Sequence, residues 1–188
     1  MPRLIVGISG STGPHYGVRL LEVLKEHRPE IETHLIMSSG ARATIAYELD
    51  RDPDSVAALA HTIHDERNVG ASIASGTFLT EGMVVAPCSM KSLSAIANSY
   101  NDNLIARAAD VCLKERRRLV LVVRETPLHL GHLRLMTSVT EAGGVILPPV
   151  PGFYHRPRTI EEVIDQTVTK ILDLFGIHLD LIQRWEGL

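Results

Sequence analysis

The sequence has few cysteines, no long apolar run and no strong net charge of either sign. Its two cysteines, Cys88 and Cys112, do not make a disulfide framework, so a reducing compartment is the simpler inference. No apolar run approaches the roughly 20 residues that a membrane helix needs. A net charge of −3 argues against a generic nucleic-acid binder. We therefore expect a soluble cytoplasmic protein with no membrane span and no nucleic-acid partner.

The 188 residues, 45% of them apolar, are enough to bury the core of one domain spanning residues 1–188. Short apolar runs alternate with segments of helical periodicity. The expected strands are 4–8, 33–37, 83–86, 119–123 and 145–147. The expected helices are 16–24, 41–49, 89–99, 103–118, 129–142 and a last long helix from Thr159. This alternation predicts an α/β fold, a single three-layer Rossmann-like or flavodoxin-like domain with a mostly parallel sheet.

Several local signals refine these elements. Asn101 and Asp102 are expected to cap the helix that follows them, and the basic run 114–118 to form its solvated last turn. The segment from Thr159 to Glu162 has the pattern of a capping box at the start of the last helix, and Ile160 is expected as the first residue of that helix's apolar stripe. Residues 50–80 have little periodicity, so we expect a loop-rich crossing with one short strand near His61.

Polar side chains follow the strands where they end. The turn 7–13 is rich in glycine and hydroxyls and leads into a helix, an arrangement that suits a phosphate. Its spacing is not that of a dinucleotide fingerprint, and the second strand ends in Ser38 without the acidic residue that a nicotinamide site uses. Strand ends meet at one edge of a parallel sheet, and here they offer Thr12, Ser38, Ser89, Lys91, Ser92, Arg124 and Glu125, with Lys114, Tyr154 and Lys170 as expected neighbours. Hydroxyls and cations together predict a site for a phosphate-bearing cofactor.

Two other chemistries have weaker support. Cys88 lies between a strand and a helix start, a position that can activate a thiol, but a small buried cysteine is the commoner case. The pairs His61/His64 and His129/His132 have helical spacing, yet neither has the companions of a zinc motif. We therefore expect no metal.

Four stretches carry a family resemblance that covers nearly the whole chain. They are GISGSTGPHYGVRLL, GMVVAPCSMKSLSAIA, NLIARAADVCLKERRRLVLVVRETPLHLGHLRLM and PPVPGFYHRP. Together they closely resemble the UbiX-type flavin prenyltransferases, within the wider group of flavin-dependent cysteine decarboxylases. The longest stretch is highly specific.

The resemblance implies an activity and its partners. Family members transfer a dimethylallyl group from dimethylallyl monophosphate to reduced FMN, at N5 and C6. The product, prenylated FMN, is the cofactor of UbiD-type decarboxylases, and no metal is required. The flavin lies between subunits of a homo-oligomer, by resemblance a homododecamer. Which pathway uses the product stays open.

The resemblance also assigns roles by position. The implied flavin contacts are Gly10, Ser11, Thr12, Ser38, Ser89, Met90, Lys91, Ser92 and Arg124. The implied catalytic positions are Glu125, Lys114, Tyr154 and Thr12. The implied substrate positions are Tyr154, Lys170 and Lys114, with Arg107 and Glu48 reaching the site across a subunit interface.

Two other functions stay open at this point. One is a flavin-dependent decarboxylase of cysteine-terminated substrates, which would need a catalytic histidine and a clamping cysteine segment. The other is a non-catalytic flavin carrier that stabilises a decarboxylase. Only 4% of residues are aromatic, which disfavours the ring sandwich of an electron-transfer flavodoxin.

Overall fold

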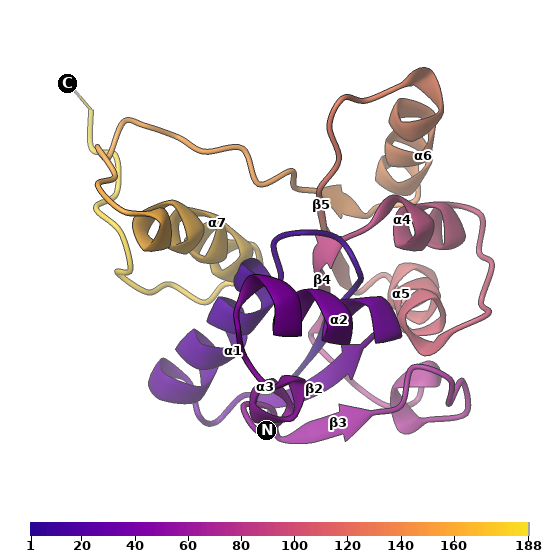
Figure 1. Cartoon of the computed structure of the whole chain (residues 1–188). Coiled ribbons are helices and arrows are strands. Elements are labelled where there is room, and N and C mark those ends of the chain that lie inside the picture. The colour runs from indigo at the N-terminus through magenta and orange to yellow at the C-terminus, as the bar shows by residue number, and fades with distance from the viewer. Residues whose placement is uncertain (188) are drawn as a thin grey trace.

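The computed structural model describes residues 1–187 and contains one six-stranded sheet (Figure 1). Its order is β3-β2-β1-β4-β5-β6, and each neighbouring pair is parallel. The strands are β1 (Arg3–Ile8), β2 (Glu32–Met37), β3 (Thr62–His64), β4 (Gly82–Cys88), β5 (Arg118–Val123) and β6 (Val145–Ile146). The expected α/β fold is confirmed, with every strand pair parallel.

Helices cover both faces of the sheet. They are α1 (His15–His27), α2 (Ser39–Glu48), α3 (Pro53–Ala57), α4 (Met90–Ala97), α5 (Leu104–Lys114), α6 (Leu130–Glu141) and α7 (Ile160–Leu174), with a short 3-10 turn at Ser72–Ala74. One core packs α1, α2, α3 and α7 against alternate residues of β1, β4 and β5, and a second packs α4, α5 and α6 against the other set. In Figure 1 the α1/α7 layer and the α4/α5/α6 layer lie on opposite sides of the strands. No helix among residues 1–187 has the length and apolarity needed to cross a membrane.

The strand order places a crevice at the centre of the sheet. From β1 the chain moves outward to β2 and β3, then returns to β4 on the other side of β1. Loops leaving β1 and β4 therefore diverge to opposite faces, and the gap between them at the carboxyl edge is where α/β sheets bind ligands.

Two expectations about α5 were wrong. Asn103, not Asn101 or Asp102, caps α5, its side chain accepting a hydrogen bond from the Ala106 amide at 3.0 Å. The basic run does not extend the helix, because α5 ends at Lys114 and Arg116 has a left-handed backbone (φ 58°).

Ile160 does not belong to the buried stripe of α7, since it is 72% exposed at the first helical position. Thr159 caps the helix as expected, but Glu162 reaches the Arg158 amide and not that of Thr159, so the capping box is only half formed.

The crossing segment contains more structure than expected. The short strand near His61 is present as β3, but α3 was missed, although Asp52 caps it and Pro53 opens it. His64 lies on a strand and not on a helix. Residues 1–187 contain no group of three or more His, Cys, Asp or Glu placed to hold a metal ion.

The contact between α1 and β4 predicts a stability effect. A Cβ on Gly17 would lie 2.2 Å from the Ala86 carbonyl oxygen, so the helix packs directly on the strand. We expect Gly17→Ala to lower the free energy of unfolding by about 2–3 kcal/mol, as overpacking does, measured by urea unfolding. Gly70→Ala is the control, because nothing lies nearer than 3.5 Å to its added Cβ. Equal stability of the two variants would contradict this packing.

Candidate active site

The loops after β1, β2 and β4 form a cavity of about 350 Å³ at the carboxyl edge of the sheet. Its lining combines two glycines, four serines, one lysine, one carboxylate, one asparagine and one isoleucine. The residues are Gly10, Ser38, Ser39, Gly40, Glu66, Ser89, Lys91, Ser92, Asn103 and Ile105. Five of these, Gly10, Ser38, Ser89, Lys91 and Ser92, were expected as site residues from the sequence. We call this space the carboxyl-edge cavity.

Backbone contact brings the first two loops together. A Cβ on Gly10 would lie 2.9 Å from the Gly40 Cα, so the turn after β1 touches the start of α2 without an intervening side chain. The Gly13 amide donates to Glu48 Oε2 at 2.9 Å, which fixes the end of the same turn to the last turn of α2. Glu48 is therefore engaged within its own chain.

Ser9 joins the first loop to the loop after β4. It is buried, its hydroxyl donates to the Pro87 carbonyl at 2.8 Å, and the same hydroxyl oxygen accepts from the Ser89 amide at 2.8 Å. The sequence analysis did not single out Ser9. Its place inside the glycine-rich turn was the available signal.

The N-termini of α2 and α4 both open on the carboxyl-edge cavity. Ser38 caps α2 through the Ala41 amide at 3.0 Å, and Ser89 caps α4 through the Ser92 amide at 3.3 Å. The remaining first-turn amides of a helix have no intrahelical acceptor and attract anions. Lys91 is exposed beside them and forms no ion pair with any residue among 1–187. This arrangement suits a phosphate.

Arg124 and Glu125 follow β5 and border the first loop. The Ser11 hydroxyl donates to the Arg124 carbonyl at 3.2 Å, and the Arg124 amide donates to the Cys88 carbonyl at 3.2 Å. The pKa of Tyr16 is raised by burial, and the nearby Arg124 charge offsets part of that rise. Glu125 is exposed, and its carboxylate accepts from the Thr126 amide at 2.9 Å.

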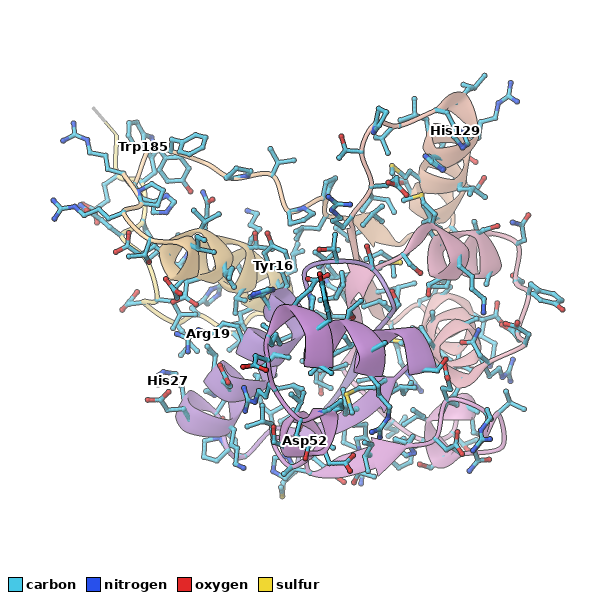
Figure 2. All side chains as sticks on the ribbon, in the orientation of Figure 1. Tyr16, Arg19, His27, Asp52, His129 and Trp185 are labelled. Carbon is cyan, nitrogen blue, oxygen red and sulfur yellow. The ribbon has the colours of Figure 1, made fainter. Side chains whose placement is uncertain are left out.

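Tyr154 and Lys170 lie together, but in a different cavity. A groove of about 460 Å³ between α7, the proline-rich loop and the C-terminal tail is lined by both, along with Asp173, Arg184 and Trp185. This groove and the carboxyl-edge cavity have no lining residue in common. Figure 2 shows Trp185 on the tail beyond α7, away from the α4 side of the sheet.

Lys114 does not join Glu125 within one chain, which corrects the expectation that the two are neighbours. Helix α5 runs antiparallel to the strands, so its last residue lies about 15 Å of helix rise from its start at the carboxyl edge. Lys114 pairs there with Glu115, beside Gly76. Arg107, on the same helix, donates to the Ala74 carbonyl at 3.2 Å.

The chain is similar to known proteins in both sequence and structure. A family model described as Flavoprotein matches residues 1–171. The "Flavin prenyltransferase UbiX" of Escherichia coli strain K12 is 60% identical over 189 residues, covering 100% of both chains. The protein of the same description from Thauera aromatica is 58% identical over 185 residues, covering 98% of this chain and 94% of the relative.

Solved structures give the same result. AnUbiX, crystallised in complex with FMN and dimethylallyl pyrophosphate, has a TM-score of 0.96 at 50% identity, covering 100% of this chain and 98% of its own. A dodecameric FMN-dependent UbiX-like decarboxylase from Escherichia coli O157:H7 also has a TM-score of 0.96, at 46% identity over 98% of this chain and 100% of its own. The peptidyl-cysteine decarboxylase EpiD, at 16% identity and a TM-score of 0.66, shares the fold alone.

The burial of Cys88 and Cys112 predicts that neither thiol reacts in the native protein. Burial raises the pKa of the Cys88 thiol to about 12, and that of Cys112 to about 12 as well. At pH 8 a thiol of that pKa is ionised in only about 1 molecule in 10⁴, and the thiolate is the reactive form. We expect the native protein to release almost no chromophore from a disulfide thiol reagent at pH 8, and both thiols to react after denaturation. Rapid reaction of one thiol in the native protein would contradict this prediction. Cys88 would then again be a candidate nucleophile.

Proposed function

The chain belongs to the flavoprotein family as a UbiX-type flavin prenyltransferase, and on that premise we propose that it joins the dimethylallyl group of dimethylallyl monophosphate to N5 and C6 of reduced FMN. The carboxyl-edge cavity is the observation that carries this proposal. It combines the open N-terminus of α4, the start of α2, a lysine and hydroxyls with a backbone-lined wall, as a planar ring bearing a phosphate requires.

The residues present fit FMN. The close contact of Gly10 with Gly40 leaves a wall without side chains, along which a flat ring can lie. The amides that open α4, the Ser89 and Ser92 hydroxyls and Lys91 offer donors for a phosphate. When bound, reduced FMN supplies the nucleophilic ring atoms of the reaction.

We assign the family's flavin positions accordingly. Gly10, Ser11 and Thr12 face the ring, and Arg124 borders it, since the Ser11 hydroxyl donates to the Arg124 carbonyl. Residues 89–92, including Met90, would hold the ribityl phosphate, and Ser38 would line the same cavity. Glu48 holds the first turn in place through the Gly13 amide.

The allyl phosphate needs cations at its leaving oxygens. Breaking the allylic C–O bond leaves charge on the phosphate, which cationic and hydroxyl donors stabilise. Tyr154 and Lys170 share the groove at α7, which supports a joint role for them in holding that phosphate. We propose that these donors suffice without a metal.

Lys114 and Arg107 support a site completed by another copy of the chain. Lys114 ends α5 and is exposed at the edge of the sheet opposite Glu125, and the Arg107 guanidinium donates to the Ala74 carbonyl. A second subunit is therefore needed to bring Lys114 to the phosphate. We propose that the chain forms a homo-oligomer, and by analogy with the dodecameric relative a dodecamer. We also propose that its product serves a UbiD-type decarboxylase.

We further propose that residues 1–188 act as one flavoprotein domain in the cytoplasm. The family match over residues 1–171 and the shared sheet support one domain, although Leu188 lies outside the described residues. Both cysteines are buried and unpaired, in keeping with a reducing compartment.

The proposed reaction has a direct test. Purified protein is mixed anaerobically with chemically reduced FMN and dimethylallyl monophosphate, and the extracted flavin is analysed by mass. We expect a flavin heavier by one C5 unit. Unchanged FMN would contradict prenyl transfer, and cysteine-terminated substrates would then test for a decarboxylase.

Glu125 is proposed to move the proton when the bond to C6 forms. The residue is exposed at the end of β5, beside the loop that carries Ser11 and Thr12, so its carboxylate can meet the reacting atoms. We expect Glu125→Gln to slow formation of the four-ring product by about 10²-fold or more while leaving the Kd for FMN unchanged.

Glu26→Gln is the matched control, because Glu26 lies in the last turn of α1 at the opposite edge, where its carboxylate is 3.7 Å from the His27 Nε2. Product formation by the Glu125 variant at the wild-type rate would rule out the proton-transfer role. Loss of FMN binding in that variant would assign Glu125 to binding instead.

A further inference from the structure

Glu66 separates two adjoining cavities. It lines the carboxyl-edge cavity, and it also lines a second cavity of about 580 Å³. We call the second space the outer cavity; it is lined by Met37, Ser39, Arg42, Ile63, His64, Asp65, Glu66 and Arg67. Only Ser39 and Glu66 belong to both linings. A ligand extending from one cavity to the other must pass these two residues.

The side chain and the backbone of Glu66 are both held. Glu66 Oε1 accepts a hydrogen bond from the Ser39 amide at 2.8 Å, which is the first amide of α2. The Glu66 carbonyl accepts from the Leu104 amide at 2.7 Å, at the start of α5. Glu66 is therefore anchored between two helix starts, by its carboxylate at α2 and by its backbone carbonyl at α5.

An anionic side chain at this place is unfavourable for anion binding. The carboxylate occupies an amide of α2 that would otherwise be open to a phosphate, and it repels a phosphate placed beside it. The other cations near it do not offset this charge. Arg42 pairs with Asp54 at 2.9 Å and Arg67 with Asp65 at 2.8 Å.

The outer cavity otherwise has the size of a ligand site. Its volume falls within the range of small-molecule pockets, about 300–1,000 Å³, and two arginines line it. FAD has a second phosphate and an adenosine beyond the phosphate that it shares with FMN. If that shared phosphate lies in the carboxyl-edge cavity, the rest of FAD would extend into the outer cavity. Repulsion and obstruction by one residue at the junction are a means of selecting against such a ligand.

We propose that Glu66 is a specificity-determining residue that restricts the flavin to a single phosphate, so that FMN is bound and FAD is rejected. This inference rests on the proposed function, since it takes the carboxyl-edge cavity as the flavin site. It assigns Glu66 no part in prenyl transfer itself.

The test compares the Kd values for FMN and FAD, measured by quenching of flavin fluorescence, in three proteins. Glu66→Gln keeps an acceptor for the Ser39 amide and removes the charge, whereas Glu66→Ala also opens the junction. We expect the ratio of the FAD Kd to the FMN Kd to fall about tenfold in Glu66→Gln, the effect of removing one like charge at close range, and further in Glu66→Ala. Glu26→Gln, on α1, should keep the wild-type ratio.

Salt provides a second readout that needs no variant. Repulsion is screened by ions, so the wild-type ratio should fall as salt is raised, while the ratio in Glu66→Gln should change little. A Glu66→Gln ratio equal to that of wild type, or a wild-type protein that binds FAD as tightly as FMN, would overturn the inference. Failure of the wild type to bind FMN would instead overturn the proposed function, so the two failures are distinguishable.

Discussion

The whole site depends on direct contact between three loops at the carboxyl edge of the sheet. Gly10 meets Gly40 backbone to backbone, and the buried Ser9 hydroxyl links the Pro87 carbonyl to the Ser89 amide. A side chain at either glycine would push the loops apart. Loss of the Ser9 hydroxyl would leave the Ser89 amide without its acceptor, while the Pro87 carbonyl would keep the hydrogen bond from the Ser9 amide at 3.2 Å. Because α2 and α4 begin in these loops, the same contacts aim both helix N-termini into one cavity.

The distribution of charge over one chain supports the proposed assembly of several copies. The carboxyl-edge cavity offers Lys91 and helix dipoles for one phosphate, while Tyr154 and Lys170 lie in a separate groove against α7. Lys114 is at the opposite edge of the sheet. A single chain thus presents parts of the proposed site on surfaces that face different directions, and assembly of several copies is the simplest way to combine them.

Much of the fold was predictable from local pattern, and much of the site was not. Buried parallel strands appear in the sequence as continuous apolar runs, such as Leu119 to Val123, and strand-end residues such as Ser38 and Ser89 are where the pattern placed them. Ser9 and Glu66 were missed because their partners lie far away in sequence, 78 to 80 residues for Ser9 and 27 for the Glu66 side chain. Lys114 matched a family position, but matching by position does not say which copy of the chain supplies a residue.

The most direct measurement is a crystal structure of the protein with FMN bound. We predict that the phosphate lies at the N-terminus of α4, within hydrogen-bond distance of the amides there and of Lys91, with the ring against Gly10 to Thr12. An FMN phosphate seated instead in the groove of Tyr154 and Lys170, with the carboxyl-edge cavity filled only by solvent, would contradict the account.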